Sequence, residues 1–306
     1  MIVIDQLSKT FGDFVAVDNL SFSVKPGDVV GFLGPNGAGK STTMKMITGF
    51  LAATTGSIKV CDYDIDSDAQ AIKQMIGYLP EGAPAYGDMT VAQFLDFIAD
   101  VRGLSGAEKK QRLQQVIKSI ELESVLYRPI DDLSKGFKRR VGLAQAIIHD
   151  PKVLILDEPT DGLDPNQKHQ VRRLIQNLSK DKIVIISTHI LEEVTAVCNR
   201  AIIIAKGKKL FDGTPDELLL QSKFHHAVTV EFATVPPSFD SLTALPSVSG
   251  LEQNGEQITV FSANNEIIFN HVFSHIQAQQ WQVNGIYAEK GRMDDVFRQL
   301  TALEQA

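Results

Sequence analysis

The chain has 306 residues, 43% of them hydrophobic, and this length and composition favour about two globular domains. Its formal net charge of −7 argues against a nucleic-acid partner, which would need a basic face. Cys61 and Cys198 stand far apart and lack metal-ligand spacing, so we expect reduced thiols of a cytosolic protein. There is no secretory signal pattern and no apolar run long enough to span a membrane. We expect a soluble chain whose membrane role comes through a partner.

The N-terminal segment, residues 1–30, alternates apolar and polar side chains, which predicts an antiparallel β-subdomain. Residues 29–33 form a short apolar run and predict a buried strand, and residues 42–48 predict a helix after it. Two further short strands are predicted over 57–60 and 76–80.

A helical insert is expected between about residues 84 and 134, where apolar side chains recur at helical spacing and Thr90 suits an N-cap. The apolar runs at 153–156, 183–186 and 201–204 then predict strands that are covered on both faces. These elements together predict an α/β domain with a mixed sheet core, reaching to about residue 220.

A second domain is expected over residues 221–306. Its strands are predicted over 228–232, 248–253, 257–261 and 281–288, and its helices over 238–245, 265–279 and 292–303. Asn254-Gly255 is a strong hairpin-turn signal between the two middle strands. The resulting order β-α-β-β-α-β predicts a small α+β, ferredoxin-like domain.

This C-terminal domain carries no catalytic constellation that we can identify. His271 and His275 have i,i+4 spacing, but no third or fourth metal ligand lies near them in the sequence, which favours a solvated helix face. We expect the domain to aid dimerisation or to regulate the first domain.

Residues 34–42 fit G-x-x-x-x-G-K-[ST], the phosphate-binding P-loop. The segment consists of Gly34, Pro35, Asn36, Gly37, Ala38, Gly39, Lys40, Ser41 and Thr42. Its glycines let successive N–H groups point at phosphate oxygens, and the helix that follows adds its positive dipole end. Lys40 supplies a charge for the β- and γ-phosphates, and the Ser41 hydroxyl is placed to ligate Mg²⁺. The alternative, a glycine-rich turn with a chance lysine, does not account for the flanking strand and helix.

The apolar strand at 153–156 ends in two carboxylates, Asp157 and Glu158. Ligands bind at the carboxyl ends of strands in α/β sheets, so both side chains are candidates for the site. Asp157 would hold Mg²⁺, directly or through water, and Glu158 could polarise the attacking water as a general base.

Over about residues 1–220, the order of these motifs resembles the ATPase subunit of ATP-binding cassette (ABC) transporters. Residues 133–137, Leu-Ser-Lys-Gly-Phe, lie where that family has its signature motif Leu-Ser-Gly-Gly-Gln. The resemblance implies that Ser134 and Gly136 contact ATP. Without the other motifs, Ser134 would be an ordinary helix N-cap.

Three more segments are similar to family motifs. Asp164 lies in Asp-Gly-Leu-Asp-Pro, which is similar to the D-loop, and His189 follows an apolar strand as the switch histidine does. Phe11 corresponds to the aromatic residue that stacks on adenine. Taken alone, His189 would be a capping residue and Phe11 a core aromatic. The resemblance implies catalytic roles for Lys40, Glu158 and His189.

The sequence departs from the family pattern at two places. Lys135 and Phe137 replace the usual Gly and Gln of the signature motif. Glu81 stands where the family has the Q-loop glutamine, and an ionised carboxylate accepts hydrogen bonds but cannot donate them. A carboxylate is also a hard ligand for Mg²⁺, so Glu81 joins Ser41 and Asp157 as a candidate metal ligand. Either the exchange is neutral within a subfamily, or it changes how the site communicates with a permease.

The Q-loop, the signature and residues 291–297 look similar to bacterial ABC-2-type exporter ATPases, including the gliding-motility-type group. The resemblance implies an ATPase that needs ATP and Mg²⁺ and forms a homodimer, because one chain has one P-loop and one signature. It also implies export through separate integral-membrane permease subunits, with this chain bound peripherally at the cytoplasmic face of the inner membrane. The alternatives are a soluble ABC ATPase with a non-transport macromolecular target and another P-loop NTPase such as a kinase.

Overall fold

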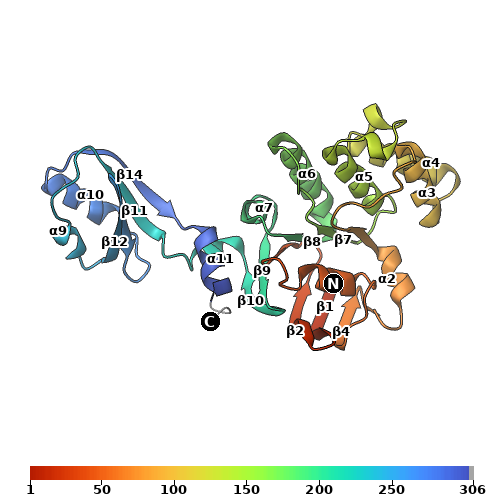
Figure 1. Cartoon of the computed structure of the whole chain (residues 1–306), viewed down its shortest axis with the longest axis horizontal. Coiled ribbons are helices and arrows are strands. Elements are labelled where there is room, and N and C mark those ends of the chain that lie inside the picture. The colour runs from red at the N-terminus through yellow and green to blue at the C-terminus, as the bar shows by residue number, and fades with distance from the viewer. Residues whose placement is uncertain (303–306) are drawn as a thin grey trace. The chain divides into compact units, whose positions relative to one another are not determined.

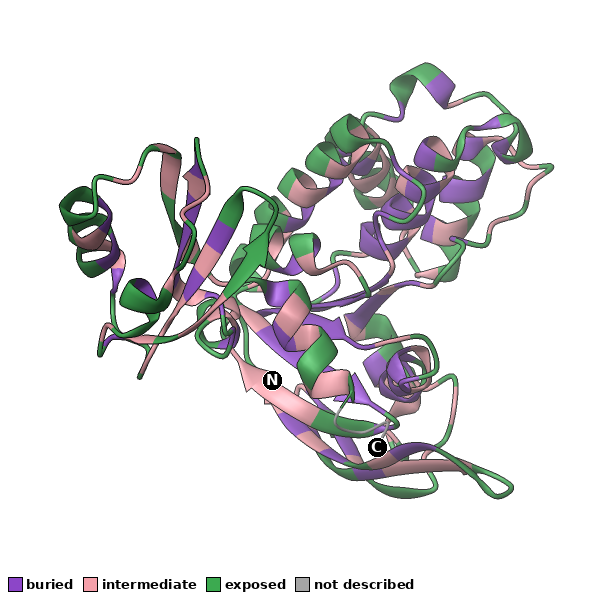
Figure 2. Ribbon diagram, turned by 60° about the vertical axis from the view of Figure 1, so that its left-hand side comes forward, coloured by how far each residue is buried: buried purple, intermediate pink, exposed green. Residues whose placement is uncertain are grey.

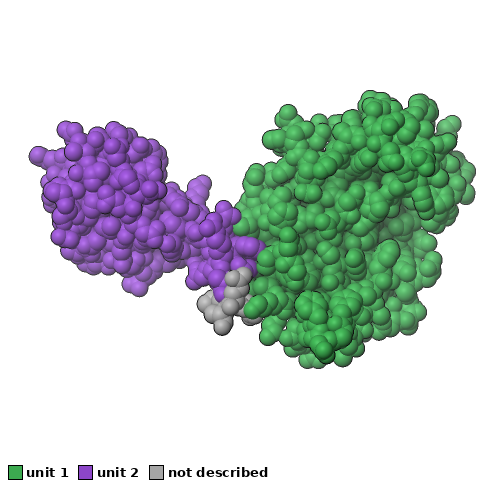
Figure 3. Space-filling view, viewed as in Figure 1, with its two compact units in different colours: residues 1–213 green, residues 214–306 purple. Residues whose placement is uncertain are grey.

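A computed structural model of the chain describes residues 1–302. The chain divides into two compact units, the first from Met1 to Gly213 and the second beginning at Thr214 (Figure 3). The sequence suggested a boundary at residue 220. The structure assigns α8 (Pro215–Leu219) to the second unit because this helix packs against α11 (Met293–Ala302).

The first unit begins with a four-stranded antiparallel sheet in the order β2-β1-β4-β5. The strands are β1 (Ile2–Phe11), β2 (Phe14–Val24), β4 (Thr55–Val60) and β5 (Tyr63–Asp64). Ile2 and Ile4 of β1 are buried, as the alternating pattern predicts for one face of a sheet. A register irregularity follows Ile4, with Gln6 at φ 47°, and Leu7 is buried in the same hydrophobic cluster.

The centre of the first unit is a six-stranded sheet in the order β10-β9-β3-β8-β7-β6, in which only the β9–β10 pair is antiparallel. The strands are β3 (Val29–Leu33), β6 (Ile76–Leu79), β7 (Val153–Asp157), β8 (Ile183–Thr188), β9 (Arg200–Ala205) and β10 (Lys208–Gly213). Every residue of β3, β7 and β8 is buried, which explains their continuous apolar runs (Figure 2).

The two faces of this sheet pack into different hydrophobic clusters. Val153 and Ile155 of β7 face the antiparallel sheet and α1 (Lys40–Ile47), whereas Leu154 and Leu156 face the helical part (Figure 1). Alternate residues of one strand therefore hold the two halves of the unit together.

Helices form the rest of the first unit. They are α2 (Ala69–Met75), α3 (Val91–Val101), α4 (Gly106–Ser119), α5 (Lys135–Ile147), α6 (Pro165–Leu178) and α7 (Leu191–Val197), with short 3₁₀ turns at Glu123–Val125, Ile130–Asp132 and Ser179–Asp181. Thr90 caps α3 as predicted, and Gln93 completes a capping box. The mixed core, antiparallel subdomain and helical insert confirm the predicted P-loop NTPase architecture.

The second unit follows the predicted β-α-β-β-α-β order. Its elements are β11 (His225–Phe232), α9 (Asp240–Thr243), β12 (Val248–Asn254), β13 (Gln257–Ser262), α10 (Phe269–Ala278) and β14 (Val283–Lys290). The antiparallel sheet order β12-β13-β11-β14 is that of a ferredoxin-like fold. Val272 and Ile276 of α10 are buried in its core with Val230 and Phe232 of β11.

None of the helices within residues 1–302 is long and apolar enough to cross a membrane.

Candidate active site

The phosphate-binding loop leaves the buried strand β3 and enters α1 at Lys40. Gly39 caps this helix with φ 101°, a left-handed conformation that favours glycine. A Cβ atom on Gly39 would lie 2.5 Å from Ala16 O, and one on Gly34 would lie 2.4 Å from Ile204 O. The loop therefore needs glycine at both positions for backbone conformation or close packing.

Lys40 is almost completely buried at the floor of this loop. Its Nζ donates hydrogen bonds to Gly34 O at 2.7 Å and to Pro35 O at 3.2 Å. Burial lowers the pKa of Lys40, while the nearby Glu158 and Asp157 carboxylates oppose that change. The ammonium group is thus held where phosphate oxygens would meet the loop.

A cavity of about 370 Å³ joins the P-loop to the acidic residues at the sheet edge. Its lining consists of Phe14, Ala16, Asn36, Gly37, Ala38, Gly39, Lys40, Ser41, Thr42, Glu81, Asp157 and Glu158. The structure therefore brings together seven of the nine expected P-loop residues, all except Gly34 and Pro35, with the carboxylates of Glu81, Asp157 and Glu158. The dimensions and the basic and hydroxyl groups suit a nucleotide's phosphates.

The aromatic residue that lines this cavity is Phe14, whereas Phe11 does not line it. The two residues pair across the turn between β1 and β2, and both side chains are exposed. Lys9 Nζ lies 5.2 Å from the centroid of the Phe11 ring. The resemblance singled out Phe11 by its motif, but the neighbouring position on the hairpin offers a second aromatic face.

Glu158 is held by several contacts at the end of β7. Its Oε1 lies 2.8 Å from His189 Nδ1, and its backbone N–H donates to Ser187 O at 2.8 Å. The Glu158 side chain is 12% exposed and that of His189 is 53% exposed. The expected base and the expected switch histidine therefore form a direct pair, with the imidazole toward solvent.

Arg139 is a site residue that the sequence analysis did not identify. It lies on α5, is 6% exposed, and donates hydrogen bonds to the carbonyl oxygens of Pro80 and Glu158. Burial lowers its pKa, and the Asp161 and Asp157 carboxylates oppose that shift. Arg139 therefore connects the signature helix to the residue before Glu81 and to Glu158 itself. The sequence carries no motif for this role. The only available signal was that Arg139 falls on the buried face of the helix predicted after Ser134.

Ser134, Gly136 and Asp164 do not line this chain's cavity. Ser134 caps α5 by accepting from Phe137 N at 3.4 Å, and Asp164 caps α6 by accepting from Gln167 N at 2.9 Å. A Cβ atom on Gly136 would lie 2.5 Å from Gln167 Oε1, so the Gln167 amide of α6 packs directly on Gly136 at the start of α5. Within one chain, these residues serve as helix caps and packing positions.

The candidate metal ligands Ser41, Asp157 and Glu81 face one cavity with oxygen donors, which suits the hard ion Mg²⁺. Within residues 1–302, no group of three or more His, Cys, Asp or Glu side chains could hold a metal ion. Mg²⁺ commonly takes one or two carboxylates and completes its shell with substrate phosphates and water. The residues present therefore fit a metal that arrives with a nucleotide.

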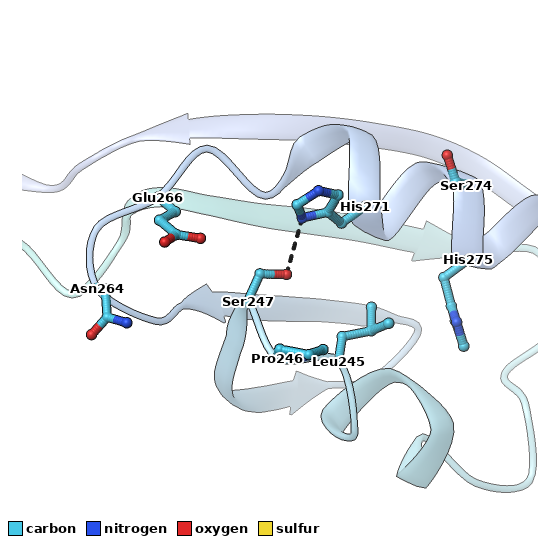
Figure 4. Close-up of a pocket in the computed structure, with 8 residues that line it drawn as sticks. All are labelled: Leu245, Pro246, Ser247, Asn264, Glu266, His271, Ser274 and His275. Atoms are coloured by element: carbon cyan, nitrogen blue, oxygen red, sulfur yellow. Dashed lines mark hydrogen bonds between the residues drawn. The ribbon is translucent and has the colours of Figure 1, made fainter.

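A second cavity, of about 660 Å³, lies in the second unit (Figure 4). Its lining includes His271 and His275 of α10, and His271 Nδ1 lies 3.1 Å from Ser247 Oγ. His275 Nε2 instead lies 3.0 Å from Ser241 Oγ. Both imidazoles are thus engaged with serine hydroxyls, and they do not converge on one point.

Comparisons with known proteins identify the family. A family model described as "ABC transporter" matches residues 17–161. The Nod factor export ATP-binding protein I of Paraburkholderia xenovorans (strain LB400) is 33% identical over 301 residues, 98% of this chain and 96% of that relative. The chain belongs to the ABC transporter family. It is an ATP-binding subunit that hydrolyses ATP, as the resemblance implied.

Other relatives support the same family assignment for this ABC subunit. The probable multidrug ABC transporter ATP-binding protein YbhF of Escherichia coli (strain K12) is 38% identical over 218 residues. That match covers 71% of this chain and only 38% of YbhF, so the chain spans less than half of that relative. A structure titled "Structure of ATP binding subunit of ABC transporter" has a TM-score of 0.67 and 30% identity, covering 72% of this chain and 92% of the other.

Proposed function

We propose that this ABC subunit powers export by separate integral-membrane permease subunits, with ATP and Mg²⁺ as its cofactors. The observation that carries the proposal is the single cavity that joins Lys40 and Ser41 to Asp157 and Glu158. The names of its relatives, which include multidrug transport and Nod factor export, support the export direction. The acidic composition gives no support for a nucleic-acid partner.

In this mechanism the P-loop binds the ATP phosphates through its N–H groups, and Lys40 neutralises the β- and γ-phosphates. Ser41, Asp157 and Glu81 would hold Mg²⁺, which supplies positive charge at the phosphates. Glu158 accepts a proton from the attacking water, whose oxygen bonds the γ-phosphorus while the bond from that phosphorus to the ADP oxygen breaks, so that ADP and phosphate leave. His189 holds Glu158 Oε1 at 2.8 Å and can contact the same phosphate from the solvent side.

A homodimer completes the site, since Ser134, Gly136 and Asp164 lie outside this chain's own cavity. We assign these three residues to the ATP held by the partner subunit, in a closed two-fold arrangement. ATP then adds contacts between the two copies, and its hydrolysis removes them. For the adenine base, Phe11 remains our stacking residue. Phe14 pairs with Phe11 across the hairpin and lines the cavity, so it offers a second aromatic ring for the base.

The permease places the subunit at the cytoplasmic face of the inner membrane. The helical insert at about 84–134 is our candidate for the contact that passes motion to it. We assign residues 221–306 a role in dimerisation or regulation, because their fold is separate from the ATP cavity.

The test uses Glu158→Gln, which keeps the size of the side chain but removes the base. With ATP and Mg²⁺ we expect a stable dimer by analytical ultracentrifugation and a loss of phosphate release of about 100-fold or more. Lys40→Ala is the matched control, and it should stay monomeric because it binds ATP poorly. Wild-type hydrolysis by Glu158→Gln, or a monomer at saturating ATP, would contradict the proposal.

The partner is tested by affinity purification of the tagged full chain from solubilised membranes. We expect a protein with several membrane-spanning segments to co-purify with it. Recovery of a ribosomal or other soluble assembly in its place would favour the alternative, a non-transport ABC ATPase.

A further inference from the structure

Glu193 is a buried carboxylate that the proposed mechanism does not use. It lies on α7, two residues after that helix begins, and only 3% of its surface is exposed. Its Oε2 accepts a hydrogen bond from Thr188 Oγ1 at 2.9 Å. Within residues 1–302, Glu193 Oε1 has no hydrogen-bond partner. Burying a carboxylate costs free energy unless other groups compensate for it, so its position next to the active site calls for an explanation.

The Thr188 hydroxyl connects Glu193 to Glu158. Thr188 ends β8 with its side chain fully buried, and its Oγ1 accepts a hydrogen bond from Ile190 N at 3.0 Å. The same oxygen lies 3.4 Å from Glu158 Oε2. Two carboxylates therefore meet at one hydroxyl group, on the side of Glu158 that does not bind His189.

One hydroxyl proton can serve only one carboxylate at a time. When Glu193 is ionised, Thr188 donates to Glu193, which is the nearer of the two. When Glu193 is protonated, it donates to Thr188, and the Thr188 proton is free to reach Glu158. Only the second arrangement lets Thr188 donate to Glu158, so Glu193 decides in which direction the Thr188 hydroxyl points.

The surroundings of Glu193 shift its balance toward the protonated form, because its pKa is raised. Burial raises the pKa of Glu193, and the charge of Glu158 acts in the same direction. The hydrogen bond from Thr188 and the cations Arg172 and Lys168 of α6 act in the opposite direction.

We propose that Glu193 is a positioning residue for ATP hydrolysis: by donating to Thr188 it turns the Thr188 hydroxyl toward Glu158, and so it orients the Glu158 carboxylate for the attacking water. The inference rests on the proposed role of Glu158 as the general base. Glu193 and Thr188 do not line the ATP cavity. Their loss should therefore lower kcat for ATP hydrolysis and leave the KM for ATP within twofold of wild type, roughly the split expected when only base orientation changes.

The experiment measures phosphate release by the full-length chain under saturating Mg²⁺, with ATP varied. Thr188→Val removes the hydroxyl at nearly constant volume and should lower kcat about tenfold, a part of the ~100-fold or more that a general base supplies. Thr188→Ser keeps the hydroxyl and should restore most of that loss. Thr195→Val is the matched control, because Thr195 lies on α7 near Glu193 and its side chain is exposed, with its hydroxyl donating to Glu192 O.

A second set of variants tests the carboxylate itself. Glu193→Ala should lower kcat about as much as Thr188→Val does, roughly tenfold, and Glu193→Gln should restore it because an amide can still bond the hydroxyl. Glu192→Gln is the matched control, since the Glu192 side chain is 76% exposed. Should Glu193→Ala fail to fold by circular dichroism, the Thr188→Val and Thr188→Ser pair decides.

Adding Thr188→Val to Glu158→Gln should cause no further loss, because both changes act on the same base. Equal kcat values for wild type, Thr188→Val and Glu193→Ala, together with an inactive Glu158→Gln, would refute the role proposed for Glu193. The role of Glu158 as the base would then still stand. Full hydrolysis by Glu158→Gln would instead overturn the proposed base.

Discussion

His149 provides a test of how the helical part is fixed to the sheet. It follows α5 by two residues, and its Nε2 lies 3.2 Å from Ile76 O at the start of β6. Burial lowers the pKa of His149 to about 4, and the Arg102 charge contributes to this shift. The neutral imidazole is therefore the form that the folded chain accommodates at this junction.

The sign of the resulting pH dependence follows from these values. The unfolded chain has an ordinary histidine, with a pKa of roughly 6.5, so between that pH and about 4 it binds more protons than the folded chain does. The contribution of His149 is fully present above about pH 6.5 and is lost as the pH falls toward 4. Between pH 7.5 and 5.0 the loss amounts to about 2 kcal/mol, or about 1 kcal/mol after allowing for the exposed part of the ring.

The assay compares urea unfolding of wild type and His149→Gln at both pH values. The only tryptophan, Trp281, lies in the second unit, so its fluorescence does not report on unfolding of the first unit. Unfolding of the first unit in urea is therefore followed by hydrogen exchange of peptides from β6 and α5. The free energy of unfolding of His149→Gln should fall less between the two pH values, by about 1–2 kcal/mol. The exposed His169 supplies the control variant His169→Gln, which should follow wild type. Equal pH dependence of wild type and His149→Gln would refute the reasoning.

Three further substitutions test the ATP site. Lys40→Met should weaken ATP binding at least about tenfold, or ~1.4 kcal/mol, because the buried cation that meets the phosphates is lost; a fluorescent ATP analogue measures this. Arg139→Met should lower the free energy of unfolding by about 2–3 kcal/mol, because the Pro80 and Glu158 carbonyls lose a charged donor; urea denaturation measures this, and Arg139→Lys should cost less. Glu81→Gln should raise the Mg²⁺ concentration for half-maximal hydrolysis roughly threefold, measured by phosphate release; an unchanged value would mark the exchange as neutral.

The central strands could be predicted from the sequence because burial on both faces leaves a continuous apolar run, as in Val153–Asp157 up to its terminal carboxylate. The pattern could not show that alternate residues of this strand face different clusters, because that depends on which elements cover each face. Likewise α6 and α7 were not predicted, since their exposed faces are polar and few of their residues are buried.

The residues of the candidate site also differ in whether the sequence alone could identify them. Lys40 and Ser41 belong to a local motif, in which spacing along the chain fixes the geometry. Arg139 and Glu193 do not, because each acts through a contact that only the packed fold creates. Their residue types gave no signal either, since a charged residue on a helix is usually solvated.

Glu158 is therefore restrained from two directions. Arg139 holds its backbone carbonyl, while Thr188 and His189 contact its two carboxylate oxygens. Arg139 lies on the same helix that Ser134 caps, and that helix start is the proposed contact with a partner subunit's ATP. A shift of α5 when the partner's ATP binds would move the guanidinium relative to Glu158 and to Pro80. Within one chain, Arg139 thus links the helix that Ser134 caps to the residue that carries the proposed base.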